Sequence, residues 1–449
     1  MTLRKRIIHS GAWVMSGHVF SQVLRLGSNL IMTRLLVPEM FGVMAIANVI
    51  MLGLSLMSDI GIHQHIIQSK RSDSEKFLNT AWVVKIIKGI ILWIISLIVS
   101  WFLFLLAGYN ILPAESVYSH PMLPYIIAVL SFTTVINGLA STKLGLANRN
   151  LAMAQVVKIE LVSQFTGMVL MISWALIDRS IWALVSGALV SSLIKSILSH
   201  VALPGHNNKF YWDRESFYEL FHFGKWIFLT STLGFLMTNG DKLVLGGLLD
   251  TKLMGVYVIA FFMASAIQQV FGRIISRVAL PAFSEVVRTR PDDLIKVYYK
   301  FRLPIDAIIL FSVGVLFMAG HHIIDILYDE RYQYAGDMLE ILVLMLIAER
   351  FSLAGECFIA LGRPKYLIPL IVPRLPIIYI LLPVIYGYFG LEGALWVIAF
   401  NNTASLPILF WLKHKHGILD TKKELLVMIF LALGIAMGWF FNVALNYIS

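Results

Sequence analysis

The chain has 449 residues and a mean hydropathy of +0.79, with 58% hydrophobic and only 14% charged residues. Soluble domains carry about 25% charged residues, so this composition excludes an ordinary soluble globular protein and predicts a membrane protein. The net charge of +10 would suit a nucleic-acid partner, but we exclude one, because the excess of Lys and Arg follows a membrane topology.

Thirteen apolar segments of membrane-spanning length follow one another along the chain, and no hydrophilic segment between them is long enough for a soluble domain. A spanning helix needs about 20 mostly apolar residues. The predicted spans are 10–36, 40–68, 77–107, 121–147, 151–177, 180–202, 220–249, 253–285, 299–328, 334–361, 365–389, 391–413 and 422–447. The predicted fold class is therefore an all-α, polytopic membrane protein.

Lys and Arg are unequally divided between the loops on the two sides of the membrane. If the N-terminus is cytoplasmic, 20 of them lie in cytoplasmic segments and 4 on the opposite side, which predicts this orientation. The other 12 of the 36 lie at membrane depth, with seven acidic residues at comparable depth. Each such charge costs about 2.5–3.5 kcal/mol, so we expect these side chains to face a bundle interior or a watery cavity. A cavity rich in cations indicates a path for an anionic molecule.

An internal repeat is visible in the sequence. LLVPEMFGVMAIA at 35–47 recurs as LLDTKLMGVYVIA at 248–260, with six of thirteen positions identical, and Arg149 and Arg363 occupy equivalent places 214 residues apart. Six spans separate the copies, so both halves enter from the same side, as in the parallel repeats of transporters. We predict six-helix lobes at 1–202 and 220–415 around a central cavity. A cytoplasmic linker at 203–219 joins them, and 416–449 adds a further helix.

A polar stripe in the first span is the leading candidate for a substrate site. His18, Gln22, Arg25 and Asn29 are spaced by 4, 3 and 4 residues, which places them on one helical face. A stripe of this kind lines a lumen or packs against polar groups of another helix, and we favour the lumen.

Other charged residues at membrane depth extend this candidate site. The further substrate-binding candidates are Lys85, Lys158, Lys242, Arg273, Arg350 and Arg374. The candidates for ion coupling are Asp59, Asp241 and Glu349. For Asp59 the alternative is a helix-end cluster with loop cations, and for Asp241 and Lys242 it is an interfacial ion pair.

Arg374 lies in the proline-rich run IPLIVPRLPIIYILLP. Proline removes a hydrogen bond from the helical ladder, so this span is predicted to be kinked or broken around Arg374. A simple packing kink is the alternative to a functional break.

Motifs of enzymes are missing from the sequence. It contains no GxxxxGK[ST], HExxH, CxxC or GxSxG pattern, and its single cysteine, Cys357, excludes a disulfide framework within the chain. We therefore predict no catalytic residues, no cofactor and no metal, and a protein that is not an enzyme.

Four stretches resemble the polysaccharide transporter family of the MOP flippase superfamily, the Wzx-type flippases. They are TRLLVPEMFGVMAIA, SDIGIHQHIIQ, LFHFGKWIFLTSTLGFLMTNGDKLVLGGLL and MGVYVIAFFMASAIQQVF, and LPAFSEV follows the last of them. The resemblance extends from about residue 3 to 415, and its most specific parts are R-L-L-x-P-x-x-F-G at 34–42 and N-x-D-K-x-x-x-G at 239–246. Many members have fourteen spans, whereas this chain is predicted to have thirteen.

The resemblance implies a flippase of the bacterial inner membrane that works by alternating access between two six-helix lobes. Its substrate would be an undecaprenyl-diphosphate-linked oligosaccharide, moved from the cytoplasmic to the outer leaflet for assembly of lipopolysaccharide O-antigen, capsule or exopolysaccharide. Polysaccharide polymerase and chain-length proteins would be further partners. Arg suits the diphosphate, because its guanidinium offers two parallel donors.

Two other functions are alternatives to this one. A multidrug or cation exporter of the same superfamily would need an acidic lumen, which twelve deep basic residues against seven acids disfavour. A membrane-embedded polysaccharide polymerase or ligase would need sizeable outer loops with catalytic side chains, and the loops here are short.

Overall fold

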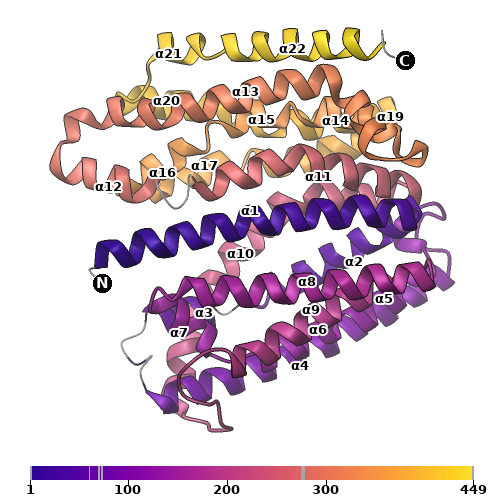
Figure 1. Cartoon of the computed structure of the whole chain (residues 1–449), viewed down its shortest axis with the longest axis vertical. Helices are drawn as coiled ribbons and strands as arrows, with labels where there is room; N and C mark the ends of the chain where they lie inside the picture. The colour runs from indigo at the N-terminus through magenta and orange to yellow at the C-terminus, as the bar shows by residue number, and fades with distance from the viewer. Residues whose placement is uncertain (1–2, 60, 69–70, 72–73, 275–278, 447–449) are drawn as a thin grey trace. The chain divides into compact units, whose positions relative to one another are not determined.

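The computed structural model describes residues 3–59, 61–68, 71, 74–274 and 279–446, and in these ranges the chain is helical without any β-strand (Figure 1). The predicted all-α class is confirmed. The chain divides into two compact units, Met1–Gly255 and Val256–Ser449. The predicted lobes come from the sequence repeat, whereas this division comes from contacts within the fold. The division does not test the lobe boundaries, which stay a prediction.

The first unit consists mainly of long helices with short connections. They are α1 (Leu3–Leu35), α2 (Pro38–Leu56), α3 (Ile62–Gln68), α4 (Glu75–Gly108), η1 (Val117–Ser119), α5 (Met122–Leu130), α6 (Phe132–Leu139), α7 (Lys143–Arg149), α8 (Met153–Ile177), α9 (Trp182–Val201) and α10 (Arg214–Leu248). α11 (Thr251–Ile274) begins in this unit and continues into the second.

The second unit contains more short and irregular helices. They are α12 (Leu280–Thr289), η3 (Pro291–Asp293), α13 (Leu294–Leu327), η4 (Glu330–Tyr332), α14 (Tyr334–Leu342), α15 (Met345–Glu349), α16 (Leu353–Ala360), η5 (Pro364–Leu367), α17 (Ile368–Ile371), α18 (Arg374–Pro376), η6 (Ile377–Leu381), α19 (Leu382–Phe400), η7 (Asn401–Ser405), α20 (Leu406–Lys415), α21 (Thr421–Leu426) and α22 (Ile429–Asn446).

Within the described residues, nine helical segments are long and apolar enough to cross a membrane. One of them, Lys365–Lys415, is 51 residues long and covers two predicted spans, which meet at Gly390, whose φ of 62° interrupts the helix. The other predicted spans correspond to α1 and α10, which carry more polar residues, and to α14–α16, which are too short singly. Each of the thirteen predicted spans therefore has a helical counterpart.

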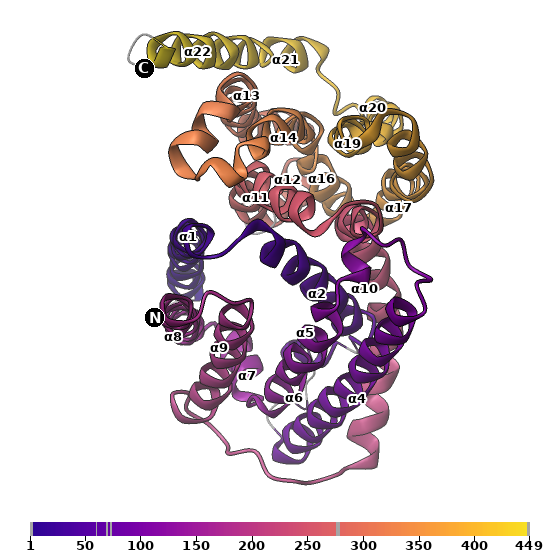
Figure 2. The same cartoon turned by 90° about the vertical axis from the view of Figure 1, so that its right-hand side faces the viewer.

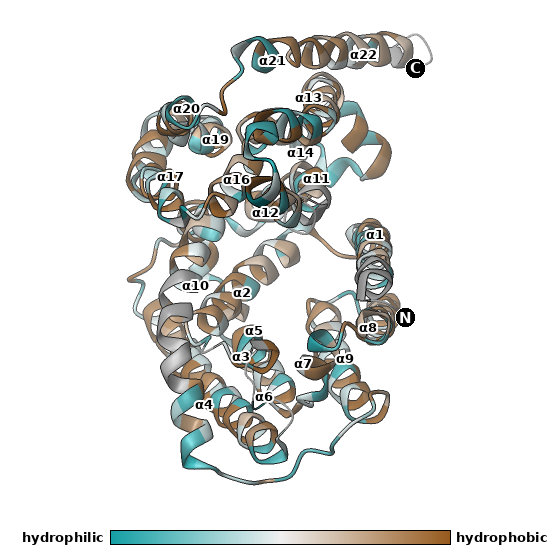
Figure 3. Ribbon diagram, turned by 90° about the vertical axis from the view of Figure 1, so that its left-hand side faces the viewer, coloured by the Kyte–Doolittle hydropathy of each residue, from teal (hydrophilic) through white to brown (hydrophobic). Residues whose placement is uncertain are grey.

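Apolar side chains cover much of the outer surface of these helices. Figure 3 shows hydrophobic residues along α4 and α22, and on α4 the exposed fractions of Ile98, Trp101 and Phe102 are 58%, 64% and 58%. Soluble monomers rarely expose apolar surface on this scale, so we assign these faces to contact with lipid.

The helix boundaries confirm the register of the internal repeat. α1 ends at Leu35 and α10 ends at Leu248, while α2 begins at Pro38 and α11 begins at Thr251, so both boundaries recur after 213 residues. The two copies of the motif are therefore two copies of one structure, a turn between a long helix and the next span.

Two glycines at equivalent repeat positions bring the first turns of α2 and α11 into backbone contact. A Cβ atom on Gly42 would lie 2.1 Å from the carbonyl oxygen of Thr251, and one on Gly255 would lie 1.9 Å from that of Pro38. No side chain fits at such separations, so glycine at both positions permits this close crossing.

The helix around Arg374 is broken, as predicted from its prolines. α17 ends at Ile371, a turn follows, and the single turn α18 then leads into the π-helical segment η6. Pro373 and Pro376 flank Arg374 and cannot donate to the preceding carbonyls, which explains why a regular helix does not continue.

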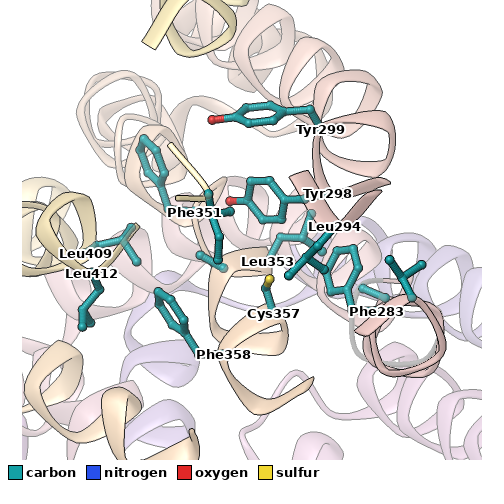
Figure 4. Close-up of a cluster of buried hydrophobic side chains, with 14 residues drawn as sticks. Phe283, Leu294, Tyr298, Tyr299, Phe351, Leu353, Cys357, Phe358, Leu409 and Leu412 are labelled. Atoms are coloured by element: carbon teal, nitrogen blue, oxygen red, sulfur yellow. The ribbon is translucent and has the colours of Figure 1, made fainter. Parts of the chain in front are cut away.

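An aromatic core joins α12, α13, α16 and α20 in the second unit. Phe283, Tyr298, Cys357 and Phe358 are fully buried there and pack with Phe351 and several leucines (Figure 4). Cys357 has no exposed surface, so a water-soluble thiol reagent should not reach it. An exposed cysteine introduced elsewhere in the chain can therefore be labelled selectively.

Five charged side chains are buried beside this aromatic core, and we call them the buried charge cluster. Its members are Arg302, Asp306, Arg350, Lys413 and Glu424. Arg302 Nε lies 2.9 Å from Asp306 Oδ2, and Glu424 accepts from both Arg302 and Lys413. Three cations thus share two carboxylates in a nearly solvent-free volume.

Candidate functional site

A cavity of about 430 Å³ lies within the first unit. Side chains from α3, α4 and α6–α9, and from the end of α2 and the residues after it, line this cavity. In Figure 2, α6, α7 and α9 lie between α4 and α8. Its charged and polar lining residues are Ser55, Asp59, His63, Lys85, Lys88, Thr134, Asn137, Ser141, Thr142, Asn148, Glu160 and Lys195. We call it the first-unit cavity.

Close packing of α4 on α6 positions two of its lysines. A Cβ atom on Gly89 would lie 2.5 Å from the carbonyl oxygen of Thr134, and one on Gly138 would lie 2.8 Å from that of Lys85. Thr134 Oγ1 also donates to the carbonyl of Gly89 over 2.9 Å. Lys85 and Lys88 lie one turn apart on α4, so both side chains reach the cavity.

The acidic residues enter from different helices. Asp59 follows the end of α2, where its Oδ1 accepts a hydrogen bond of 3.0 Å from the backbone N–H of Gly61, whose φ is 63°. This turn directs the chain from α2 into α3. Glu160 lies on α8, across the cavity from α4.

Ion pairs and hydrogen bonds connect the lining side chains. Lys88 Nζ lies 3.6 Å from Asp59 Oδ1, and Lys195 Nζ lies 3.6 Å from Glu160 Oε1. Lys85 Nζ instead donates to the carbonyl of Ala140 over 2.6 Å. With three lysines and two carboxylates, the cavity has a surplus of one positive charge when His63 is neutral.

The structure brings two predicted site residues together in this cavity, namely Lys85 and Asp59. The ion partner of Asp59 is Lys88 on the next span rather than a cation of a loop. Lys88, Lys195 and Glu160 were not among the predicted site residues. The spacing of Lys85 and Lys88 was a usable signal, but only the fold shows that α8 and α9 complete the same cavity.

The polar stripe of α1 lies elsewhere in the first unit. α1 packs on α8, where Ser21 Oγ donates to Gln164 Oε1 over 2.6 Å and Gly17 allows close approach. The stripe residues lie about a quarter turn around α1 from this contact. Of the four stripe residues, Arg25 is exposed, and the other three, His18, Gln22 and Asn29, are half-buried.

Three further predicted residues of the first unit are held by local contacts. The ammonium group of Lys158 lies 5.5 Å from the ring centre of Trp13, which places it at the packing of α1 on α8 and not in the first-unit cavity. Asp241 is buried and lies 3.4 Å from Lys242 Nζ on the same helix.

In the second unit, Glu349 and Arg374 come close to each other at the broken helix. Glu349 accepts hydrogen bonds from Asn402, over 3.4 Å, and from the side chain of Gln268, and Arg374 lies near enough to stabilise its charge. Arg350 points into the buried charge cluster instead, with its guanidinium 4.5 Å from the ring centre of Phe351. The side chain of Arg273 lies outside the described residues.

This arrangement suits the binding of a polar ligand. Lysine ammonium groups and amide donors attract an anion, while carboxylates accept hydrogen bonds from hydroxyl groups. Among the described residues, no three His, Cys, Asp or Glu side chains are placed to hold a metal ion.

Comparison with known proteins places the chain in a family. Residues 31–336 match the family model described as polysaccharide biosynthesis protein. The lipopolysaccharide biosynthesis protein WzxC of Escherichia coli (strain K12) is 23% identical over 350 residues, which cover 76% of this chain and 67% of that protein.

Solved structures of two membrane proteins share the fold of this chain. The lipid II flippase MurJ in an inward closed conformation has a TM-score of 0.68 at 14% identity, covering 96% of this chain and 92% of that chain. An inward-facing multidrug resistance MATE family transporter has a TM-score of 0.62 at 14% identity, covering 88% and 94%. The family model covers more than half of the chain and shows that the chain belongs to the polysaccharide biosynthesis protein family, with the fold of the MurJ and MATE structures.

Proposed function

We propose that this protein moves undecaprenyl-diphosphate-linked oligosaccharides from the cytoplasmic to the outer leaflet of the bacterial inner membrane by alternating access. The observation that carries the proposal is the first-unit cavity, where Lys85, Lys88 and Lys195 gather among apolar spanning helices. Charges at this depth are costly unless they serve a polar ligand or each other. A polyprenyl tail can remain in lipid while its glycosyl diphosphate head crosses between the helices.

Transport can be measured directly in proteoliposomes that contain a lipid-linked oligosaccharide. We expect the protein to raise the fraction of glycan that becomes accessible to an added glycosidase, compared with protein-free vesicles. We assign the diphosphate to Arg25 of the α1 stripe, outside the first-unit cavity, so Arg25→Ala should reduce this rate about tenfold or more. Arg25→Lys should recover it only in part, because an ammonium cannot replace the guanidinium fork. Arg288→Gln, which removes an exposed cation of α12, is the control and should leave the rate unchanged. Equal rates with and without protein would refute the function.

The orientation in the membrane is part of the proposal. The unequal distribution of Lys and Arg favours a cytoplasmic N-terminus and cytoplasmic segments at 203–219 and 414–421. A phosphatase fused after residue 207, which is active only outside the cytoplasm, should therefore be inactive. An active fusion would reverse the direction assigned to each helix.

A further inference from the structure

The charge balance of the first-unit cavity centres on Lys85. Of the described residues that line the cavity, Lys88 and Lys195 each face a carboxylate, whereas the polar contact of the Lys85 ammonium is the carbonyl oxygen of Ala140 at 2.6 Å. An ammonium group has three N–H donors, so Lys85 keeps two donors and one uncompensated positive charge for a ligand.

The two ion pairs of the cavity are loose enough for a hydroxyl group beside each of them to bond to both partners. Both nitrogen–oxygen distances are 3.6 Å, which is longer than a direct hydrogen bond of about 2.7–3.2 Å. A hydroxyl group can donate to Asp59 or Glu160 and accept from the facing lysine. Asn137 and Ser55 add neutral polar atoms to the lining. Such alternation of donors and acceptors suits a polyhydroxylated ring.

The size of the cavity limits what it can hold. Its volume of about 430 Å³ is near the lower end of the roughly 300–1,000 Å³ that is usual for small-molecule sites. The enclosed part of the cavity therefore has room for one sugar unit or two.

We propose that the first-unit cavity binds a carboxylate-bearing sugar, such as a hexuronic acid, with Lys85 as its counter-charge. A monocarboxylate neutralises the single surplus charge, whereas a diphosphate would add at least one charge more than the cavity can balance. The inference rests on the proposed function and specifies the substrate class, an acidic oligosaccharide repeat unit.

Binding to the purified full-length protein in detergent tests the chemistry of the cavity. We expect saturable binding of glucuronate by calorimetry and no binding of glucose under the same conditions. Lys85→Met should weaken glucuronate binding about tenfold or more, and Lys252→Met, which removes an exposed lysine outside the cavity, should not. Preference for glucose 1-phosphate over glucuronate, or unchanged binding to Lys85→Met, would overturn the inference.

Transport of two matched lipid-linked glycans separates this inference from the proposed function. One substrate carries an acidic sugar, and the other is the same molecule after reduction of its carboxylate to an alcohol. The wild-type protein should transport the acidic form several-fold faster, and Lys85→Met should remove the difference. Equal transport of both forms by the wild-type protein refutes the acidic-sugar site and leaves the flippase function intact. Transport of neither form refutes the flippase function, while calorimetry still decides whether the cavity binds glucuronate.

Discussion

Gly255→Ala is expected to prevent the accumulation of folded protein. The added Cβ atom would lie 1.9 Å from the carbonyl oxygen of Pro38, and both atoms belong to helix backbones that cannot rotate away. Overpacking usually costs about 1–3 kcal/mol, and we expect a loss at or above the upper end of this range because the clash is with backbone. Fluorescence-detected size-exclusion chromatography of the tagged protein measures the folded fraction.

The repeat supplies a second variant and the chain supplies a control. Gly42→Ala should behave like Gly255→Ala, because its Cβ atom would lie 2.1 Å from the carbonyl oxygen of Thr251. Gly27→Ala should be tolerated, since nothing lies within 4 Å of the Cβ atom that it adds to α1. A monodisperse Gly255→Ala protein with an unchanged melting temperature would mean that α2 and α11 separate readily at this crossing.

The features that sequence predicted best are determined locally along the chain. The repeat register, the break at Gly390 and the broken helix at Arg374 each depend on a few neighbouring residues. Proline and glycine act on the backbone at their own positions, so their effects can be read without knowing the fold.

The features that sequence missed depend on partners distant in the chain. Arg302 and Lys413 lie at the cytoplasmic ends of two predicted spans, where cations are expected to reach water, yet their exposed fractions are 1% and 0%. Glu424 reaches both of them from α21, more than a hundred residues beyond Arg302. Loop counting cannot detect such pairing, and the same limit explains why Lys195 and Glu160 were not recognised as cavity residues.

The buried charge cluster has one positive charge in excess, because it contains three cations and two carboxylates. A substitution that increases this excess should therefore destabilise the protein more than one that removes it. Tyr299 donates to Glu424 over 2.9 Å, so this carboxylate binds a hydroxyl group as well as two cations. It connects α13, α20 and α21. Removing one partner from a buried ion pair usually costs about 3–5 kcal/mol, because the remaining charge is left without compensation.

Glu424→Gln is therefore expected to destabilise the second unit by about 3–5 kcal/mol, because three cations would then share the single carboxylate of Asp306. Lys413→Met should cost less, since it leaves two cations and two carboxylates. The double variant returns the cluster to one surplus positive charge, so it should be more stable than Glu424→Gln alone.

Lys422→Met, which removes an exposed cation on the same helix as Glu424, is the control and should change stability little. Thermal unfolding in detergent, analysed as a double-mutant cycle, measures the coupling between the two positions. If the double variant were instead less stable than Glu424→Gln by the full cost of Lys413→Met, the two side chains would act independently, and α21 would be held by apolar packing rather than by charge.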